Sequence, residues 1–338
     1  MLNPVSDTQH LPWADLEEEL LQESPQQWYE RIRAVDSNNL VNLHRMVINR
    51  FATPAELQAC LEAHRRDGSP WPSMRNWEFQ ASTFVPGLID EPQPIRRHRW
   101  EAAGFHFYAY GHETAGTERP CLIGLPGDYG LLMAPGPFVI EALARLGWDL
   151  ILVRRQRRES FLAGDGARLL ELSDALQATL PGISGSLGAG DGRRCAVLGS
   201  STGALAALVL AEQLGARRGI ALCALASEAM LRPGDGVLDR CRHPEAEASA
   251  GPSNLLLVYP AEHDQDRDHA LRIASYYRTR SPRPGSLTLR GYEGCHGHTL
   301  HRDLVEQGWT LTEIHRHLLE QAPLPPIRCR EERLIPPA

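Results

Sequence analysis

The sequence, 338 residues long, lacks any apolar run long enough to cross a lipid bilayer. A basic region followed by an apolar core, the sign of a secretory signal peptide, is also missing from its start, MLNPVSD. From these two absences we expect neither a membrane span nor export through a signal peptide. We therefore expect a cytoplasmic protein without a membrane partner.

Cysteine spacing typical of metal sites or disulfide frameworks is missing as well. The chain has seven cysteines, an odd number, and no two of them form a CxxC pair. Several lie inside apolar, strand-like runs, where a thiol behaves as a small hydrophobic group. We expect the thiols to be reduced, as in a cytoplasm, and we expect neither a metal nor a cofactor.

Charge of a single sign does not dominate any part of the chain. Lysine and arginine total 35 and aspartate and glutamate total 42, which gives a formal net charge of -7. The two signs are mixed along the sequence, so we expect no nucleic-acid partner. The 29 glycines and 25 prolines follow no fixed period, which excludes collagen-like and repeat architectures. Hydrophobic residues make up 42%, enough for a large buried core.

The first part of the chain shows no strand pattern, and the spacing of its apolar residues predicts helices instead. Trp13–Glu23 and Pro25–Val35 space their apolar residues as helices do. Thr53 followed three residues later by Glu56 is typical of a capping box at a helix start. We predict that residues 1–95 form a helical N-terminal extension or cap. Two interpretations stay open: it covers a site, or it only packs on the core or on another subunit.

From about Arg96, short apolar runs alternate with helix-length segments. Nearly continuous apolar strands separated by helices predict a doubly wound, mostly parallel sheet in an α/β core over residues 96–325, followed by a C-terminal tail at 326–338. The expected strands are Gly104–Tyr110, Cys121–Leu125, Trp148–Val153, Cys195–Leu198, Gly219–Leu225, Asn254–Tyr259 and Ser286–Leu289. The expected helices are Pro137–Leu146, Ala167–Leu180, Gly203–Leu214 and Asp268–Tyr277.

The motif most typical of a reacting centre is Gly199-Ser200-Ser201-Thr202-Gly203. It lies between an apolar strand and a helix rich in alanine and leucine, the context that a nucleophile elbow requires. The glycines let strand and helix approach closely, and the helix dipole favours negative charge beside Ser201. We predict Ser201 as a nucleophile. The alternatives are a glycine/serine turn that only aids packing and a phosphate-binding turn, for which a P-loop lysine is missing.

This motif and the order of polar residues after it resemble the α/β-hydrolase superfamily over roughly Arg96 to Gln321. The resemblance implies a triad of serine, then a carboxylate, then histidine along the chain. It places the carboxylate just past the strand Asn254–Tyr259, where Asp264 is favoured and Asp266 is the alternative. For both, a first-turn acid that only stabilises a helix is the competing interpretation.

The same resemblance places the histidine in the loop after the last strand. His298 is favoured because it follows Gly297 and precedes Asp303, and His296 is the alternative. In this scheme His298 accepts the serine proton while the carboxylate orients the imidazole. A metal cluster is the other interpretation of the histidines, although their spacing matches no known metal motif. The histidines in question are His269, His296, His298 and His301.

The loop after Cys121–Leu125 resembles the His-Gly-x oxyanion loop of the superfamily, with Pro126 in the place of the histidine. The resemblance implies that the backbone N–H groups of Asp128 and Thr202 bind an oxyanion. Tyr129, Arg154 and Arg155 are predicted to bind substrate, because loops after parallel strands meet at one edge of the sheet. The competing interpretation of the arginines is a solvated, ion-paired loop.

The C-terminal region, with Asp266, His298 and Asp303–Trp309, also resembles hydrolase-like proteins of bacterial surface-polysaccharide loci. We expect a serine hydrolase that cleaves an ester or thioester through an acyl-enzyme, acting on a small-molecule or carrier-bound acyl substrate. A serine acyltransferase and an inactive hydrolase-fold scaffold are the alternatives. A homo-oligomer is left open.

Overall fold

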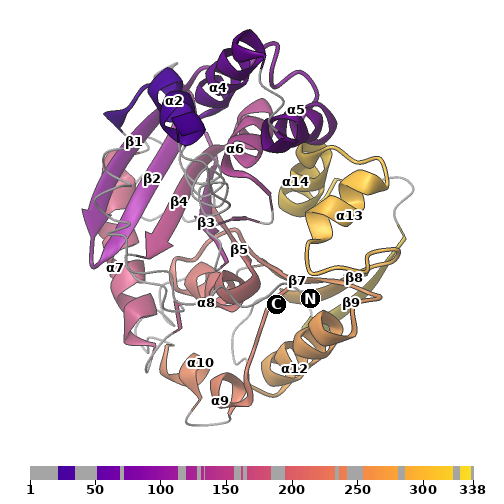
Figure 1. Ribbon diagram of the computed structural model, residues 1–338. Helices are drawn as coiled ribbons and strands as arrows, with labels where there is room; N and C mark the ends of the chain where they lie inside the picture. The colour runs from indigo at the N-terminus through magenta and orange to yellow at the C-terminus, as the bar shows by residue number, and fades with distance from the viewer. Residues whose placement is uncertain are drawn as a thin grey trace.

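The computed structural model describes residues 22–34, 52–68, 72–112, 119–127, 131–132, 134–155, 161–162, 166–183, 195–232, 236–241, 254–280, 286–322 and 328–335. Along the chain, helices come first and a strand–helix alternation follows (Figure 1). The helices are α2 Pro25–Ala34, α4 Pro54–Asp67, α5 Pro72–Phe84, α6 Gly136–Arg145, α7 Ala167–Ile183, η2 Ser201–Gly203, α8 Ala204–Gln213, α9 Glu228–Leu231, α10 Val237–Arg240, α12 Asp264–Arg280, α13 Leu300–Glu306 and α14 Leu311–Glu320. The strands are β1 Ile95–Ala102, β2 Phe105–His112, β3 Cys121–Leu125, β4 Asp149–Arg155, β5 Cys195–Ser200, β6 Arg218–Leu222, β7 Asn254–Pro260, β8 Ser286–Tyr292 and β9 Cys329–Ile335.

The strands form one sheet in the order β1-β2-β4-β3-β5-β6-β7-β8-β9. Strands β4, β3, β5, β6, β7 and β8 run parallel, whereas β1, β2 and β9 pair antiparallel with their neighbours. Because parallel strands need crossover connections, helices cover both faces. The predicted fold class, an α/β-hydrolase-like fold with a mostly parallel sheet, is confirmed.

Alternation of side chains along each strand divides the interior into two cores. On β5, Ala196 and Leu198 face one core while Cys195 and Val197 face the other. The first core is closed by α2, α4, α5, α6, α13 and α14, and the second by α7, α8, α10 and α12. Burial on both faces explains why β3, β5 and β6 have no exposed residue.

The helices before the sheet share the first core, and α4 packs against α6. Thr53 accepts a hydrogen bond from the backbone of Glu56, and Glu56 accepts one from the backbone of Thr53, so the predicted capping box is present. Both terminal nitrogens of Arg97 on β1 also bind Glu56, which ties α4 to the edge of the sheet. Of the expected helix Trp13–Glu23, all but the last two residues lie outside the described residues. Whether the extension covers a site stays a prediction.

Two edge strands differ from the predictions. Strand β1, which was not among the expected strands, forms a hairpin with β2 through Ala103 and Gly104, which both have positive φ. Strand β9 lies in the expected C-terminal tail and pairs with β8. Both strands are rich in charge, which is typical of edge strands and hides the apolar signal of a strand.

None of the helices in the described part of the chain is both long enough and apolar enough to cross a membrane. The segment 227–252, whose proline, glycine and charge favour either a lid over the site or a merely mobile loop, contains the short helices α9 and α10. Residues 233–235 and 242–252 lie outside the described residues, so both interpretations stay predictions.

Candidate active site

The serine motif forms a sharp turn from β5 into α8. Ser201 has φ +52, a left-handed conformation that is uncommon for a residue with a side chain. The flanking positions must be glycine because neither has room for a side chain. A Cβ on Gly199 would lie 2.3 Å from the carbonyl oxygen of Gly203, and one on Gly203 would lie 2.3 Å from that of Leu125. The turn therefore presents the Ser201 hydroxyl at the carboxyl end of β5, beside the start of a buried helix.

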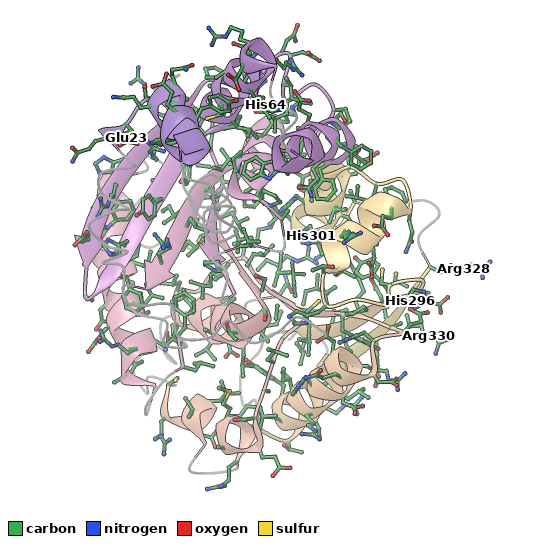
Figure 2. The ribbon with its side chains drawn as sticks, in the orientation of Figure 1. Glu23, His64, His296, His301, Arg328 and Arg330 are labelled. Atoms are coloured by element: carbon green, nitrogen blue, oxygen red, sulfur yellow. The ribbon has the colours of Figure 1, made fainter. Side chains whose placement is uncertain are left out.

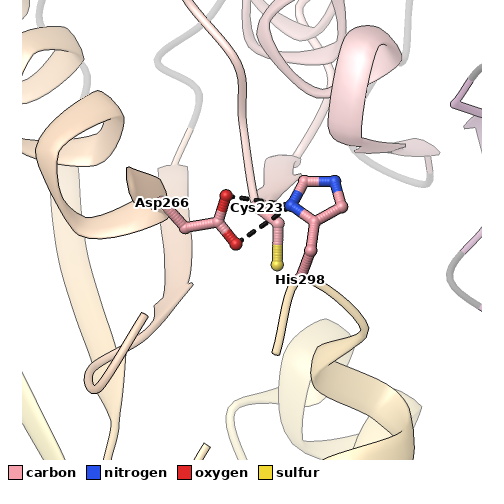
Figure 3. Close-up of side chains that lie close together, drawn as sticks. All are labelled: Cys223, Asp266 and His298. Atoms are coloured by element: carbon pink, nitrogen blue, oxygen red, sulfur yellow. Dashed lines mark hydrogen bonds and ion pairs between the residues drawn. The ribbon is translucent and has the colours of Figure 1, made fainter. Parts of the chain in front are cut away.

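The structure brings Ser201, His298 and Asp266 together from three separate segments. The imidazole Nε2 of His298 lies 2.9 Å from the Oγ of Ser201. Its Nδ1 lies 2.9 and 3.0 Å from the two carboxylate oxygens of Asp266 (Figure 3). In this arrangement Nδ1–H donates to the carboxylate, which leaves the Nε2 lone pair free to accept the serine proton.

The favoured carboxylate, Asp264, lies outside this arrangement, so the expectation that it contacts the histidine is wrong. Helix α12 starts at Asp264, four residues before the predicted start. As its first residue, Asp264 points into solvent with 83% of its side chain exposed and pairs with Arg267. Two residues later the helix turns inward, and Asp266 is 1% exposed. The alternative carboxylate is therefore the one beside His298.

The loop that carries His298 is held by backbone hydrogen bonds to acidic side chains. Asp303 Oδ2 accepts from the backbone N–H groups of His296 and Gly297, at 2.8 and 2.9 Å. The carboxylate of Glu262 accepts from the backbone of Cys295. The alternative histidine, His296, is exposed and lies near the surface (Figure 2). The structure thus brings His298, and not His296, to Ser201.

Two side chains next to Asp266 were not singled out from the sequence. The Nδ1 of His263 lies 3.1 Å from Oδ2 of Asp266. The thiol of Cys223, at the end of β6, is fully buried beside the same carboxylate. Burial and the charge of Asp266 raise the pKa of the Cys223 thiol well above its usual range, so the thiol stays protonated. Position at the carboxyl end of a parallel strand was the only sequence signal for Cys223.

A buried serine fixes the loop on the other side of the nucleophile. Ser200 donates through Oγ to the carbonyl of Leu131, at 2.8 Å, and accepts from the backbone N–H of Gly127, at 3.2 Å. A Cβ on Gly127 would approach the Cβ of Ser201 to 3.0 Å, so this loop runs against the nucleophile. The predicted oxyanion donor Asp128 and the predicted substrate ligand Tyr129 lie outside the described residues.

The structure describes only some of the remaining predicted site residues. Thr202 follows Ser201 in the turn η2, next to the start of α8, where a backbone donor is expected. Arg154 lies near the carboxyl end of β4 and pairs in register with His106 of β2. Arg155 ends the same strand, and its side chain is not described. Substrate binding by these arginines stays a prediction.

The four histidines considered as a metal cluster have different surroundings. His269 Nδ1 lies 2.9 Å from the carbonyl of Ala226. His301, on α13, is fully buried inside the molecule (Figure 2), with its ring centroid 5.5 Å from that of His315. Burial, with the neighbouring His315, lowers the pKa of His301 well below its usual range. In the described part of the chain, the group able to hold a metal is instead Cys223, Asp266 and His298.

Comparisons with known proteins assign this chain to no family. No protein-family profile matches this chain, and no curated protein matches it. Among solved structures, 435 chains match. One is a crystal structure from Bacteroides ovatus named as a "putative dipeptidyl aminopeptidase IV", with 15% identity and a TM-score of 0.47. The match covers 70% of this chain and 37% of that one, so the chain spans less than two fifths of its length.

Proposed function

We propose that the chain is a serine hydrolase that cleaves an ester or thioester through an acyl-enzyme on Ser201. The observation that carries this proposal is the continuous set of contacts from Ser201 Oγ to His298 and from His298 to Asp266. A serine hydroxyl is a poor nucleophile at neutral pH and needs an adjacent base. An imidazole within 2.9 Å, oriented by a buried carboxylate, meets that need.

In the proposed reaction, Ser201 Oγ attacks the carbonyl carbon of the substrate while His298 Nε2 takes the hydroxyl proton. The imidazole becomes positively charged, and Asp266 stabilises this charge through Nδ1–H. His298 then gives the proton to the leaving alcohol or thiol, which departs and leaves the acyl group on Ser201. A water molecule, deprotonated by His298, releases the acid in the second half of the reaction.

The negative oxygen of the tetrahedral intermediate needs donors that are already in place. We propose the backbone N–H of Thr202 as one donor, since it lies at the turn into α8, where the helix dipole also favours negative charge. Asp128 is proposed as the second. Gly127 does not fill this role, because its N–H already donates to the hydroxyl of Ser200 on β5 and to the carbonyl of Leu131.

A fluorophosphonate probe tests the proposal without knowledge of the substrate. Wild-type protein should be phosphonylated at one site, and Ser201→Ala should abolish labelling. Ser82→Ala, at an exposed serine on α5, is the matched control and should label like wild type. Folded wild-type protein that does not label would favour an inactive binding or scaffold protein.

A second assay separates hydrolysis from acyl transfer. Activated esters and acyl thioesters should be turned over by wild-type protein and not by Ser201→Ala, with free acid as the product. Addition of alcohol or amine acceptors leaves the product unchanged in a hydrolase. Acylated acceptor as the main product would instead assign the same three residues to a serine acyltransferase.

A further inference from the structure

Three potential metal ligands converge beside the proposed nucleophile. Cys223 follows β6, Asp266 lies in the first turn of α12, and His298 lies in the loop before α13. The thiol sulfur, a carboxylate oxygen and an imidazole nitrogen all lie within 4.8 Å of one another (Figure 3). Thiolate, imidazole and carboxylate are the three kinds of ligand that Zn²⁺ takes from proteins.

The spacing between the nitrogen and the oxygen requires only a small movement to hold such an ion. In tetrahedral zinc geometry, two light ligand atoms lie about 3.4 Å apart, and a sulfur and a nitrogen about 3.6 Å apart. The His298 nitrogen and the Asp266 oxygen are 2.9 Å apart, so they must separate by about 0.5 Å to reach that spacing. His298 lies on a loop and is 37% exposed, so it is the ligand that can move and the side from which an ion can enter.

The surroundings of the thiol and the carboxylate fit a metal site. Cys223 has φ +50, a left-handed conformation that favours glycine, and its N–H is held by the carbonyl of Val258. Non-glycine residues in this conformation cluster at functional sites. The Nδ1 of His263 also accepts a hydrogen bond from the backbone N–H of Asp266 and lies 3.1 Å from its Oδ2, so His263 holds this residue from behind.

We propose that Cys223, Asp266 and His298 form a reversible inhibitory site for a soft divalent cation of the Zn²⁺ class. The inhibitory consequence rests on the proposed serine chemistry, whereas binding of the ion does not. The cation binds the Nδ1 lone pair of His298, so the imidazole proton moves to Nε2. The bound cation displaces the proton that the thiol of Cys223 otherwise keeps; this proton is released to solvent, and the residue binds as thiolate. With a proton on Nε2, His298 cannot accept one from Ser201, and the nucleophile stays inactive.

Cobalt provides a test that is independent of catalysis. Co²⁺ is added to Ser201→Ala protein, and absorption is followed for a thiolate-to-cobalt charge-transfer band. The expected result is one equivalent bound with this band, lost in Ser201→Ala/Cys223→Ala. It should persist when Cys60, a buried cysteine of α4, is replaced by alanine instead. No band, or a band unaffected by loss of Cys223, overturns the proposal.

Inhibition gives the second readout. Zn²⁺ should slow phosphonylation of wild-type Ser201, and a chelator should restore it. Mg²⁺ and Ca²⁺, which prefer oxygen ligands, should have no effect. Cys223→Ala should raise the Zn²⁺ concentration for half inhibition at least tenfold, because loss of even a supporting neighbour weakens metal binding 10–100-fold. Equal inhibition of both proteins overturns the site. A cobalt band without any labelling of Ser201 would support the proposed metal site and refute the proposed serine hydrolase.

Discussion

Replacement of Asp266 by asparagine should impair the proposed chemistry far more than the same change at Asp264. His298 Nδ1 lies 2.9 and 3.0 Å from the two oxygens of Asp266, a fully buried carboxylate. An asparagine there has no charge to stabilise the imidazolium, and its amide group favours the wrong tautomer of His298. The equivalent change in a Ser-His-Asp protease lowers kcat about 10⁴-fold. We therefore expect a loss of about 10³–10⁴-fold, or about 4–5.5 kcal/mol of transition-state stabilisation.

Asp264→Asn is the matched control. The side chain of Asp264 is 83% exposed, and its partner Arg267 is 44% exposed. Exposed ion pairs contribute little, about 0–1 kcal/mol, and this one does not touch His298. The rate should stay within about twofold of wild type.

The assay for this pair is the second-order rate of phosphonylation by a fluorophosphonate, with thermal unfolding measured in parallel. The rate is compared only among proteins that retain a cooperative unfolding transition. A folded Asp266→Asn protein that keeps a tenth or more of the wild-type rate would refute this account of the carboxylate. A large loss in Asp264→Asn would refute it equally.

Three further substitutions test the packing around the site. Ser200→Ala removes the two hydrogen bonds between the Ser200 hydroxyl and the loop beside the nucleophile. It should cost about 1–3 kcal/mol of stability and slow phosphonylation. An unchanged melting temperature and an unchanged rate would contradict this. Gly203→Ala puts a Cβ 2.3 Å from the carbonyl oxygen of Leu125 and should destabilise the fold by about 1–3 kcal/mol and abolish labelling, whereas normal labelling would exclude this close approach. The pKa of buried His301 is lowered, so its contribution to stability is complete above the unfolded value near 6.5 and is lost as pH falls towards the folded value. His301→Phe should therefore lose less stability than wild type between pH 7.5 and pH 5, measured by denaturant unfolding, and an identical pH dependence in both proteins would contradict the assignment.

The parts of the fold predicted from the sequence are those with a strong local signal. The buried parallel strands, such as Cys121–Leu125, are continuous apolar runs. The glycines on either side of Ser201 are needed because a side chain at either position would collide with the backbone. Strands β1 and β9 were missed because edge strands rich in arginine and glutamate lack an apolar pattern. Local sequence shows which faces are buried, but not which exposed-looking segment completes a sheet.

Residues whose roles depend on the start of a helix or on distant contacts were harder to predict. The choice between Asp264 and Asp266 depends on where α12 begins, and a shift of two residues in a helix turns a side chain from solvent to the interior. Cys223 lies beside Asp266 only because β6 ends and α12 begins at the same edge of the sheet. No pattern within either segment records that contact.

The most direct measurement is the identity of the residue that is acylated during turnover. Protein quenched while it hydrolyses an activated ester should carry one acyl group, mapped by peptide mass spectrometry to Ser201, and the adduct should form at least 10³-fold more slowly in His298→Ala. An adduct on any other residue, or formation at the same rate without His298, would contradict the proposed nucleophile and its base.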